Sequence, residues 1–248
     1  MRALITGASS GIGRDMAKYL SKLGYNLVLV ARNEEAMKKL KNELNTDVEI
    51  IVADLSNNEN CIKVYEQARD VDILINNAGF GEFGNFTETD LKKEISMIRT
   101  NIEATHILTK MYLKDMVEKN SGHILNVASI AGFMPGPLMA TYYATKNYVV
   151  SLTRGIRKEL KKSNSKVKLS LLCPGPVNTN FNNVANVEFK AKGLSSEYVA
   201  KYAIDNMLKN KFIIIPGLSI KMVRFFAKIL PTSVIEEFCY HIQKRKKN

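Results

Sequence analysis

Short apolar runs of strand length recur along the chain, separated by stretches with polar residues at helical spacing. Successive positions in these runs are mostly Ile, Val, Leu or Ala, which is typical of strands buried on both faces of a sheet. The runs are RALIT, NLVLVA, VEIIVA, DILIN, HILNVA, KLSLLC and FIIIP. Between them, segments such as 33–45, 56–70 and 88–119 are predicted to be helical.

Strands and helices alternate from residue 1 to about residue 215 without a linker or an internal repeat. Such alternation predicts an α/β fold with a doubly wound parallel sheet of about seven strands and helices on both faces. We expect one domain over residues 1–217, with its last strand near 212–215. Residues 218–248 are expected to form a C-terminal extension of that domain, with two helices separated at Pro231.

A glycine-rich turn follows the first predicted strand. The segment TGASSGIG, residues 6–13, places Gly7, Gly11 and Gly13 directly before a helix. Glycines allow a tight turn and a close approach to a pyrophosphate, and the helix N-terminus supplies amide donors and a favourable dipole. With the hydroxyls of Ser9 and Ser10, this turn predicts a dinucleotide-binding site.

The end of the second predicted strand indicates which dinucleotide is preferred. The sequence there is VLVARNEE, so Arg32 and Asn33 follow the strand and the first acid, Glu34, falls within the next helix. An acid at this point accepts the ribose 2′-hydroxyl of NAD, whereas an arginine accommodates the 2′-phosphate of NADP. The sequence therefore predicts that NADP(H) is preferred over NAD(H).

Composition narrows the class of protein. Hydrophobic residues make up 46% and charged residues 24% of the 248 residues, the balance of a soluble globular protein. The apolar run ALIT begins at residue 3, which leaves no room for a signal peptide, and no apolar run approaches the roughly 18 residues of a membrane span. Cys61, Cys173 and Cys239 are far apart, as are the three histidines, so we expect no metal site and a reducing, cytoplasmic location.

The segment TYYATK, residues 141–146, raises a chemical question. In a helix, Tyr142 and Lys146 lie at i and i+4 on one face, and Tyr143 also comes near the same lysine. These six residues alone leave two interpretations open: an ordinary surface helix, or a phenol prepared for acid–base chemistry.

Seven motifs together resemble the short-chain dehydrogenase/reductase family over about residues 1–217, in matching order and at compatible spacing. They are TGASSGIG at 6–13, Asp54 in ADLS, NNAG at 76–79, Asn101 in RTNIEA, Ser129 in NVASIAG, YYATK at 142–146 and PGPVNT at 174–179. The resemblance implies a Rossmann-type fold and an NADP-preferring carbonyl reductase.

The resemblance also implies a catalytic set made of Asn101, Ser129, Tyr142 and Lys146. The family pattern Tyr-x-x-x-Lys selects Tyr142 over Tyr143 as the acid in carbonyl reduction. Lys146 is expected to lower the phenol pKa and to bind the nicotinamide ribose. Ser129 is expected to hold the substrate oxygen, and Asn101 to interrupt its helix and hold a water that relays protons to Lys146.

The same resemblance extends the cofactor-binding set beyond the glycine turn. Asp54 and Leu55 are expected to flank the adenine, while Asn76 is expected to be structural. The full expected set is Gly7, Ser9, Ser10, Gly11, Ile12, Gly13, Arg32, Asn33, Asp54, Leu55, Asn77, Ala78, Gly79, Tyr142, Lys146, Pro174, Gly175, Val177 and Thr179.

Several apolar side chains are expected to line the substrate pocket and to receive an apolar substrate end. They are Phe80, Phe83, Phe133, Met134, Leu138, Phe181 and Phe189. The resemblance extends to reductases of 3-oxoacyl thioesters, of hydroxysteroids, and of general ketones or aldehydes. The sequence does not choose among these small-molecule substrates.

The C-terminal tail is basic and amphipathic. Residues 209–248 contain nine Lys or Arg and two acids, so +7 of the net charge of +12 lies there. Between 218 and 230, Lys221, Arg224 and Lys228 form a stripe opposite a wide apolar surface. Pocket cover or packing is the favoured interpretation; a membrane surface or a second subunit is the alternative. No basic groove with reading elements is seen, so nucleic acid is not an expected partner.

Two functions from different classes compete. An oxidoreductase is favoured over a cofactor-binding regulator or scaffold without turnover, because a regulator has no need of the complete catalytic set. Family members commonly pair through two long helices, here about 100–119 and 145–162. Their apolar positions include Ile107, Leu108, Met111, Tyr112, Val149, Val150, Leu152 and Ile156. A homodimer is therefore expected, with a homotetramer as the alternative.

Overall fold

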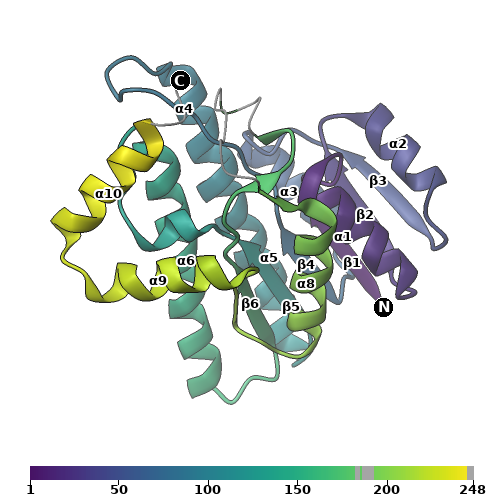
Figure 1. The fold of residues 1–248 in the computed structure, drawn as a ribbon. Coiled ribbons are helices and arrows are strands. Elements are labelled where there is room, and N and C mark those ends of the chain that lie inside the picture. Colours follow the sequence, from purple (N-terminus) through teal and green to yellow (C-terminus); the bar gives the residue numbers. More distant parts are fainter. Residues whose placement is uncertain (182–184, 186–192, 245–248) are drawn as a thin grey trace.

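One parallel sheet organises the described part of the chain (Figure 1). The computed structural model describes residues 1–181, 185 and 193–244. In this part the sheet has seven strands in the order β3-β2-β1-β4-β5-β6-β9, and each neighbouring pair is parallel. The strands are β1 (Arg2–Thr6), β2 (Asn26–Ala31), β3 (Val48–Val52), β4 (Ile73–Asn76), β5 (His123–Val127), β6 (Lys168–Leu172) and β9 (Ile213–Ile214). The predicted fold class is confirmed.

Helices connect the strands and pack on both faces of the sheet (Figure 1). Polar side chains set several helix starts: Asn33, Asn57, Asp90 and Ser195 each accept a hydrogen bond from a backbone amide of the first turn. The helices are α1 (Gly11–Lys22), α2 (Glu34–Asn42), α3 (Asn58–Gln67), α4 (Leu91–Ile98), α5 (Thr105–Glu118), α6 (Ala140–Lys162), α8 (Ser196–Leu208), α9 (Leu218–Ile229) and α10 (Thr232–Lys244). A small additional sheet pairs β7 (Val177–Asn178) with β8 (Leu194–Ser195).

The continuous apolar runs of the strands are explained by two cores, one on each face of the sheet. In β1, Ala3 and Ile5 enter the core that contains α1, α2 and α8, while Leu4 enters the core that contains α3 and α5. Successive strand residues point to opposite faces, so a sheet covered on both sides needs an apolar residue at every position. The continuous apolar runs in the sequence therefore indicated a sheet that is buried on both faces.

The predicted helical stretch 88–119 is helical but not uniform. A π-helical segment, Arg99–Ala104, lies between α4 and α5 and contains the buried Asn101. Such a segment inserts an extra residue into the helical turn and is frequent at functional sites. Here it directs the Asn101 side chain inward, toward the loop that follows β4.

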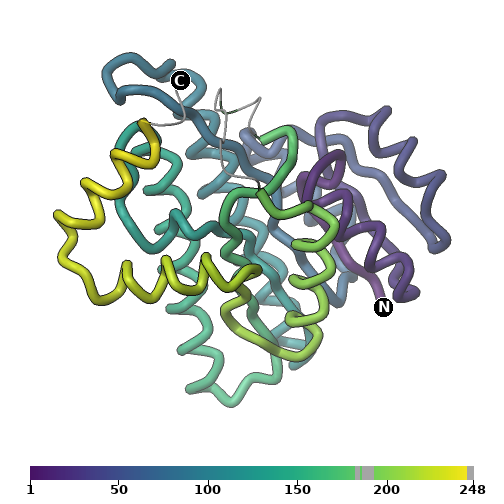
Figure 2. Tube along the Cα trace, in the orientation of Figure 1, coloured from purple at the N-terminus to yellow at the C-terminus, as the bar shows by residue number. Residues whose placement is uncertain are grey.

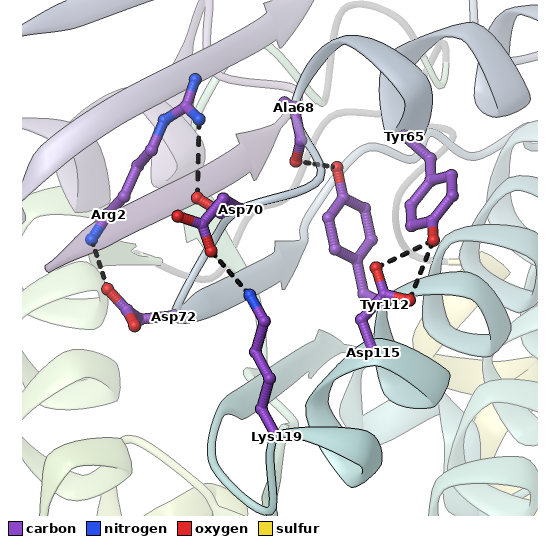
Figure 3. Close-up of polar contacts among 8 residues, drawn as sticks. All are labelled: Arg2, Tyr65, Ala68, Asp70, Asp72, Tyr112, Asp115 and Lys119. Carbon is purple, nitrogen blue, oxygen red and sulfur yellow. Dashed lines mark hydrogen bonds and ion pairs between the residues drawn. The ribbon is translucent and has the colours of Figure 1, made fainter.

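Polar contacts fasten the amino end of the sheet (Figure 3). The fully buried Tyr112 of α5 donates its hydroxyl to the Ala68 carbonyl at 2.9 Å, where α3 has ended. The Arg2 amide donates to Asp72 Oδ2 at 2.7 Å, which joins β1 to the segment before β4. Further contacts join Tyr65 to Asp115 and Lys119 to Asp70. Because these bonds join segments far apart in sequence, they hold α3, α5 and β1 in one arrangement.

The last two helices lie beside α6, away from α1 and α2 (Figure 2). Pro231 separates α9 from α10, as predicted. Helix α9 packs against a short 3₁₀ helix, η2 (Ile130–Phe133), through the half-buried Ile220, Val223 and Ala227. Helix α10 turns Ile235, Cys239 and Gln243 inward. Within the described residues, no helix is long and apolar enough to cross a membrane.

The Tyr112 contact generates a stability prediction. Tyr112→Phe removes a buried hydroxyl and leaves the Ala68 carbonyl without its partner, which costs about 1 kcal/mol. In a domain of this size the melting temperature should fall by roughly 2–4 °C. Tyr198→Phe is the matched control, because Tyr198 is exposed. Equal melting temperatures for the two variants in calorimetry would show that the Tyr112 hydroxyl contributes nothing.

Candidate active site

The glycine turn is shaped by close approaches as well as by backbone angles. Gly7 and Gly11 have positive φ angles of 66° and 54°, the region that L side chains rarely adopt. A Cβ at Gly13 would lie 2.5 Å from the Gly7 carbonyl oxygen, and one at Gly7 would lie 2.9 Å from Ala78 Cα. Any side chain at these two positions would push the turn away from the loop after β4. The turn therefore delivers the N-terminus of α1 directly to the crevice between β1 and β4.

The loop after β4 is tied to the glycine turn by hydrogen bonds. Asn77 Nδ2 donates to the Thr6 carbonyl at 2.9 Å, and Thr6 Oγ1 accepts from the Asn77 and Ala78 amides at 2.9 and 3.0 Å. Asn76 instead donates to Asn126 Oδ1 at 2.9 Å and to Thr109 Oγ1 at 3.0 Å, which joins β4 to β5 and α5. Asn77 thus belongs to the site wall, and Asn76 to the core.

Arg32 and Asp54 follow β2 and β3 at the same edge of the sheet. The Arg32 side chain is 71% exposed, and its Nη1 lies 3.9 Å from Asp54 Oδ2. Asn33 caps α2, because its Oδ1 accepts from the Ala36 amide at 2.9 Å. The Arg32 guanidinium is therefore free to reach a phosphate, whereas the Asn33 side chain already has a structural partner.

Tyr142 and Lys146 stand one turn apart on α6. Lys146 Nζ lies 5.9 Å from the centre of the Tyr142 ring and donates to the Val127 carbonyl at 3.1 Å. Burial raises the pKa of Tyr142 to about 12, partly opposed by its hydrogen bond with Ser129. Burial also lowers the pKa of Lys146 to about 8. In the chain by itself, the phenol is therefore protonated at neutral pH and is available as an acid.

Ser129 lies where β5 and β6 end, at the carboxyl edge of the sheet. It follows β5 and caps η2, with its Oγ accepting from the Ala131 amide at 3.1 Å and donating to the Pro174 carbonyl at 3.4 Å. Its contact with the Tyr142 hydroxyl brings the two oxygens together on one wall of the site. A carbonyl oxygen placed against this pair would meet both hydroxyls at once.

Asn101 acts on the site through the backbone. Its Oδ1 accepts from the Phe80 amide at 3.1 Å, and its Nδ2 donates to the Phe80 carbonyl at 2.9 Å and to Thr145 Oγ1 at 3.0 Å. A Cβ at Gly79 would lie 2.9 Å from Asn101 Oδ1 and 3.3 Å from Lys146 Nζ, so the three groups crowd together. Asn101 joins the loop after β4 to α6 at Thr145, the residue before Lys146.

A cavity of about 550 Å³ runs along the carboxyl edge of the sheet. It brings together most of the residues predicted for cofactor and catalysis. Its lining includes Gly7, Ser9, Ser10, Gly11, Ile12, Arg32, Asn33, Asp54, Leu55, Asn77, Ala78, Gly79, Ser129, Tyr142, Lys146, Pro174, Gly175, Val177 and Thr179. Gly13 and Asn101 do not line the cavity. A Cβ at Gly13 would clash with the Gly7 carbonyl, and the water relay from Asn101 to Lys146 stays a prediction.

Only some of the residues predicted to line the substrate pocket lie at the cavity. Phe80 and Phe181 line the cavity, whereas Phe83, Phe133, Met134 and Leu138 do not. The Phe133 ring contacts the guanidinium groups of Arg154 and Arg224, which lie 5.3 and 4.9 Å from its centre. Met134 packs against Ile235 and Cys239 of α10. Phe189 lies outside the described residues.

The C-terminal helices explain why Phe133 and Met134 do not line the cavity, and they add a lining residue that the sequence analysis missed. Because α9 and α10 cover η2, Phe133 and Met134 become an interface with the tail instead of a cavity wall. The missed lining residues include Ile130, Met139, Tyr143 and Gln243. Gln243 had one local signal, its i, i+4, i+8 spacing with Ile235 and Cys239, but an amide at such a position does not by itself indicate a site.

Comparisons with known proteins agree with this geometry. The family model for short chain dehydrogenases matches residues 1–188. An uncharacterized oxidoreductase of Staphylococcus aureus (strain USA300) is 33% identical over 226 residues, covering 89% of this chain and 96% of that protein. A second uncharacterized oxidoreductase, from Staphylococcus epidermidis (strain ATCC 12228 / FDA PCI 1200), is 36% identical over 181 residues, covering 71% and 78%.

Two solved structures extend the comparison to cofactor complexes. A short-chain dehydrogenase from Sphingobium yanoikuyae in complex with NADPH is 27% identical, with a TM-score of 0.82, covering 94% of this chain and 97% of that one. A short chain dehydrogenase/reductase from Burkholderia phymatum in complex with NAD is 27% identical, with a TM-score of 0.83, covering 92% of each chain.

The chain belongs to the short-chain dehydrogenase/reductase family. It is an NAD(P)-dependent oxidoreductase that acts on alcohol and carbonyl groups. The family assignment made from its motifs is confirmed.

The two adjacent tyrosines generate a prediction about the acid. Tyr142→Phe should lower kcat by on the order of 100-fold or more, because it removes the proton donor from the Ser129 wall. Cofactor binding, followed by fluorescence, should persist. Tyr143→Phe should still turn over a simple ketone. If Tyr143→Phe were the inactive variant instead, the assignment of the acid to Tyr142 would be wrong.

Proposed function

We propose that the protein is an NADP(H)-dependent carbonyl reductase that transfers hydride between NADPH and a largely apolar carbonyl substrate. The main support is the joining of two sites in one cavity: the glycine turn at one end, and Ser129, Tyr142 and Lys146 on the wall. A dinucleotide suits this shape, because the N-terminus of α1 offers amides to phosphates and Gly7 and Gly13 leave no side chain between the turn and Ala78. When bound, NADPH supplies the hydride.

The chain's own residues would supply the proton and the orientation. Ser129 and Tyr142 would hold the substrate oxygen, and Tyr142 would release its proton to that oxygen as the carbonyl is reduced. The Lys146 ammonium would stabilise the phenolate left behind. Asn101 would keep Lys146 in place through Phe80 and Thr145. In the oxidation direction, the phenolate would accept the proton of an alcohol.

The substrate class is proposed from the composition of the wall. Phe80, Met139 and Phe181 surround the reactive end of the cavity, and the Phe181 ring lies 5.4 Å from that of Tyr142. This surface suits 3-oxoacyl, hydroxysteroid or simple ketone and aldehyde substrates. Assaying a panel of these carbonyls by loss of NADPH absorbance tests the proposal. No turnover with any of them, together with tight NADP(H) binding, would favour the alternative of a regulator or scaffold.

A preference for NADP(H) is proposed from the exposed Arg32 at the end of β2. Its guanidinium reaches toward the cavity, and no acid stands before Glu34 of α2. A charge-assisted bond to a 2′-phosphate would favour NADPH, while the Asp54 carboxylate 3.9 Å away would keep the arginine aimed at the crevice. We also propose a reducing cytoplasm as the location, because the three cysteines are free.

The Arg32 assignment predicts a selective loss. Arg32→Ala should weaken NADPH binding roughly tenfold or more, because a hydrogen bond to a charged group is lost. NADH binding should change little. Lys38→Ala, which removes another exposed cation from α2, is the control. Titration followed by the fluorescence of the reduced nicotinamide measures the binding of both cofactors, because the protein has no tryptophan. Equal losses for NADPH and NADH would contradict the assignment.

Two association surfaces are also proposed. Of the apolar positions on α5 and α6, Leu108, Tyr112, Val149 and Val150 are consumed by the monomer's core. The half-buried Met111 and Leu152 remain to support a homodimer, together with the exposed parts of Ile107 and Ile156, which also pack against the core. On α9, a separate stripe of Leu218, Met222, Phe225 and Ile229 faces outward, between 53% and 73% exposed.

The outward α9 stripe suits an anionic membrane surface. It lies opposite the residues that pack on η2 and is bordered on one side by Lys221 and Lys228. The helix has no acidic residue. Two copies of this stripe facing each other would bring like charges together, which argues against its use in a symmetric dimer.

Vesicle binding tests the α9 stripe. The protein should co-sediment with vesicles that contain phosphatidylglycerol, less so as salt rises, and the Phe225→Ser/Ile229→Ser double variant should not. Phe86→Ser changes an exposed phenylalanine elsewhere and is the control. In light scattering, all three proteins should keep the mass of a dimer. A double variant that becomes monomeric would assign the stripe to subunit contact.

A further inference from the structure

An amide from the C-terminal helix stands in the wall of the catalytic cavity. Gln243 lines the cavity with Tyr142, Tyr143 and Met139, although 100 residues separate it from Tyr143 in the sequence. Its side chain is only 1% exposed. Glutamine is rarely buried to this extent, and the other two inward positions of α10 are Ile235 and Cys239. A third apolar residue would have sufficed for packing.

The hydrogen bonds of this amide are incomplete. Gln243 Nε2 donates to the Tyr143 hydroxyl at 2.6 Å, whereas Gln243 Oε1 is buried and has no hydrogen-bond partner among residues 1–181, 185 and 193–244. A buried polar atom without a partner costs about 1–3 kcal/mol. At a cavity wall, a ligand that donates a hydrogen bond to this oxygen removes that free-energy cost.

Tyr143 complements the amide. Its hydroxyl accepts from Gln243 and keeps its own proton available to donate, while burial raises the pKa of the phenol and keeps it neutral. The ring is closely confined, because a Cβ at Gly136 would lie 2.2 Å from it, and it meets the Tyr142 ring at 6.1 Å. The pair therefore offers one acceptor and one donor, next to the acid but distinct from it.

We propose that Gln243 and Tyr143 form a subsite for a neutral hydroxyl or amide group of the substrate, remote from the carbonyl that is reduced. A hydroxyl donates to Gln243 Oε1 and accepts from Tyr143, so it satisfies both groups at once. If the Gln243 amide turned over, Tyr143 would donate to Oε1 and the nitrogen would need an acceptor, which a hydroxyl also provides. The subsite rests on the proposed function, since it assigns the cavity to a carbonyl substrate.

Matched ligands test the subsite. The probes are pairs of ketones that differ only by a hydroxyl or a methyl group: meta- and para-substituted acetophenones, and ω-hydroxy-2-alkanones with their methyl-terminated counterparts. Dissociation constants are measured by calorimetry on the full chain, without cofactor and with NADP⁺. In at least one pair, the hydroxyl ligand should bind about tenfold more tightly.

Gln243→Met keeps the length of the side chain but removes its hydrogen bonds. It should reduce the hydroxyl preference to about onefold, while the methyl ligands bind as before. The melting temperature should change little, because the loss of the hydrogen bond to Tyr143 is offset by the removal of a buried oxygen that has no described partner. Ile242→Met places the same residue at the neighbouring exposed position and should keep the preference. Tyr143→Phe should also weaken it.

Three results would overturn the subsite: no hydroxyl preference in any pair, a preference that survives Gln243→Met, or an equal loss of both ligands with a lower melting temperature. The last result would mean that Gln243 only supports packing. The proposed reductase function fails separately, if these ketones cause no loss of NADPH absorbance while the binding preference and its loss in Gln243→Met are seen.

Discussion

The parallel arrangement of the strands is the constraint on which the rest of the structure depends. Because all neighbouring strands run the same way, the loops after β1 to β6 emerge at one edge. The chain crosses from β3, at one side of the sheet, to β4 beside β1, which opens a crevice between the loops after β1 and β4. The strand side chains are consumed by the two cores, so cofactor and chemistry must be held by loops and by the start of α1 and α6.

Burial then determines the chemistry available at that edge. The Tyr142 phenol and the Lys146 ammonium are both withdrawn from water, and their pKa values move in opposite directions, to about 12 and about 8. Each shift favours the neutral form. A buried cation whose described hydrogen bond goes to the Val127 carbonyl is poised to respond to negative charge formed nearby, because charges interact more strongly where water is excluded. In the proposed reaction, that charge would be the Tyr142 phenolate left beside Lys146.

The C-terminal helices complete the molecule in two directions. Inward, α9 and α10 cover η2 and bring Gln243 to the cavity, so the last described turns of the chain contribute to a site built mainly from residues before 182. Outward, α9 presents apolar side chains bordered on one side by lysines. In the sequence, the apolar residues of α9 form one wide surface. That surface alone did not show which residues pack inward and which meet a membrane or a second subunit. The tertiary structure assigns Ile220, Val223 and Ala227 to packing and leaves the opposite stripe exposed.

The sequence by itself determined the strands, the glycine turn, and the spacing of Tyr142 and Lys146. These features are local. Apolar runs indicate buried strands, glycines indicate positions where a side chain would not fit, and residues at i and i+4 share one face of a helix. Only the tertiary structure decided that Phe133 and Met134 pack against the C-terminal helices. It also decided that Asn101 hydrogen-bonds the Phe80 backbone and that Gln243 hydrogen-bonds Tyr143. Such contacts join residues far apart in the chain, and an apolar or amide side chain carries no local mark of which distant partner it will meet. Packing chooses that partner, because the cores must be filled without voids and each buried polar group seeks a hydrogen bond.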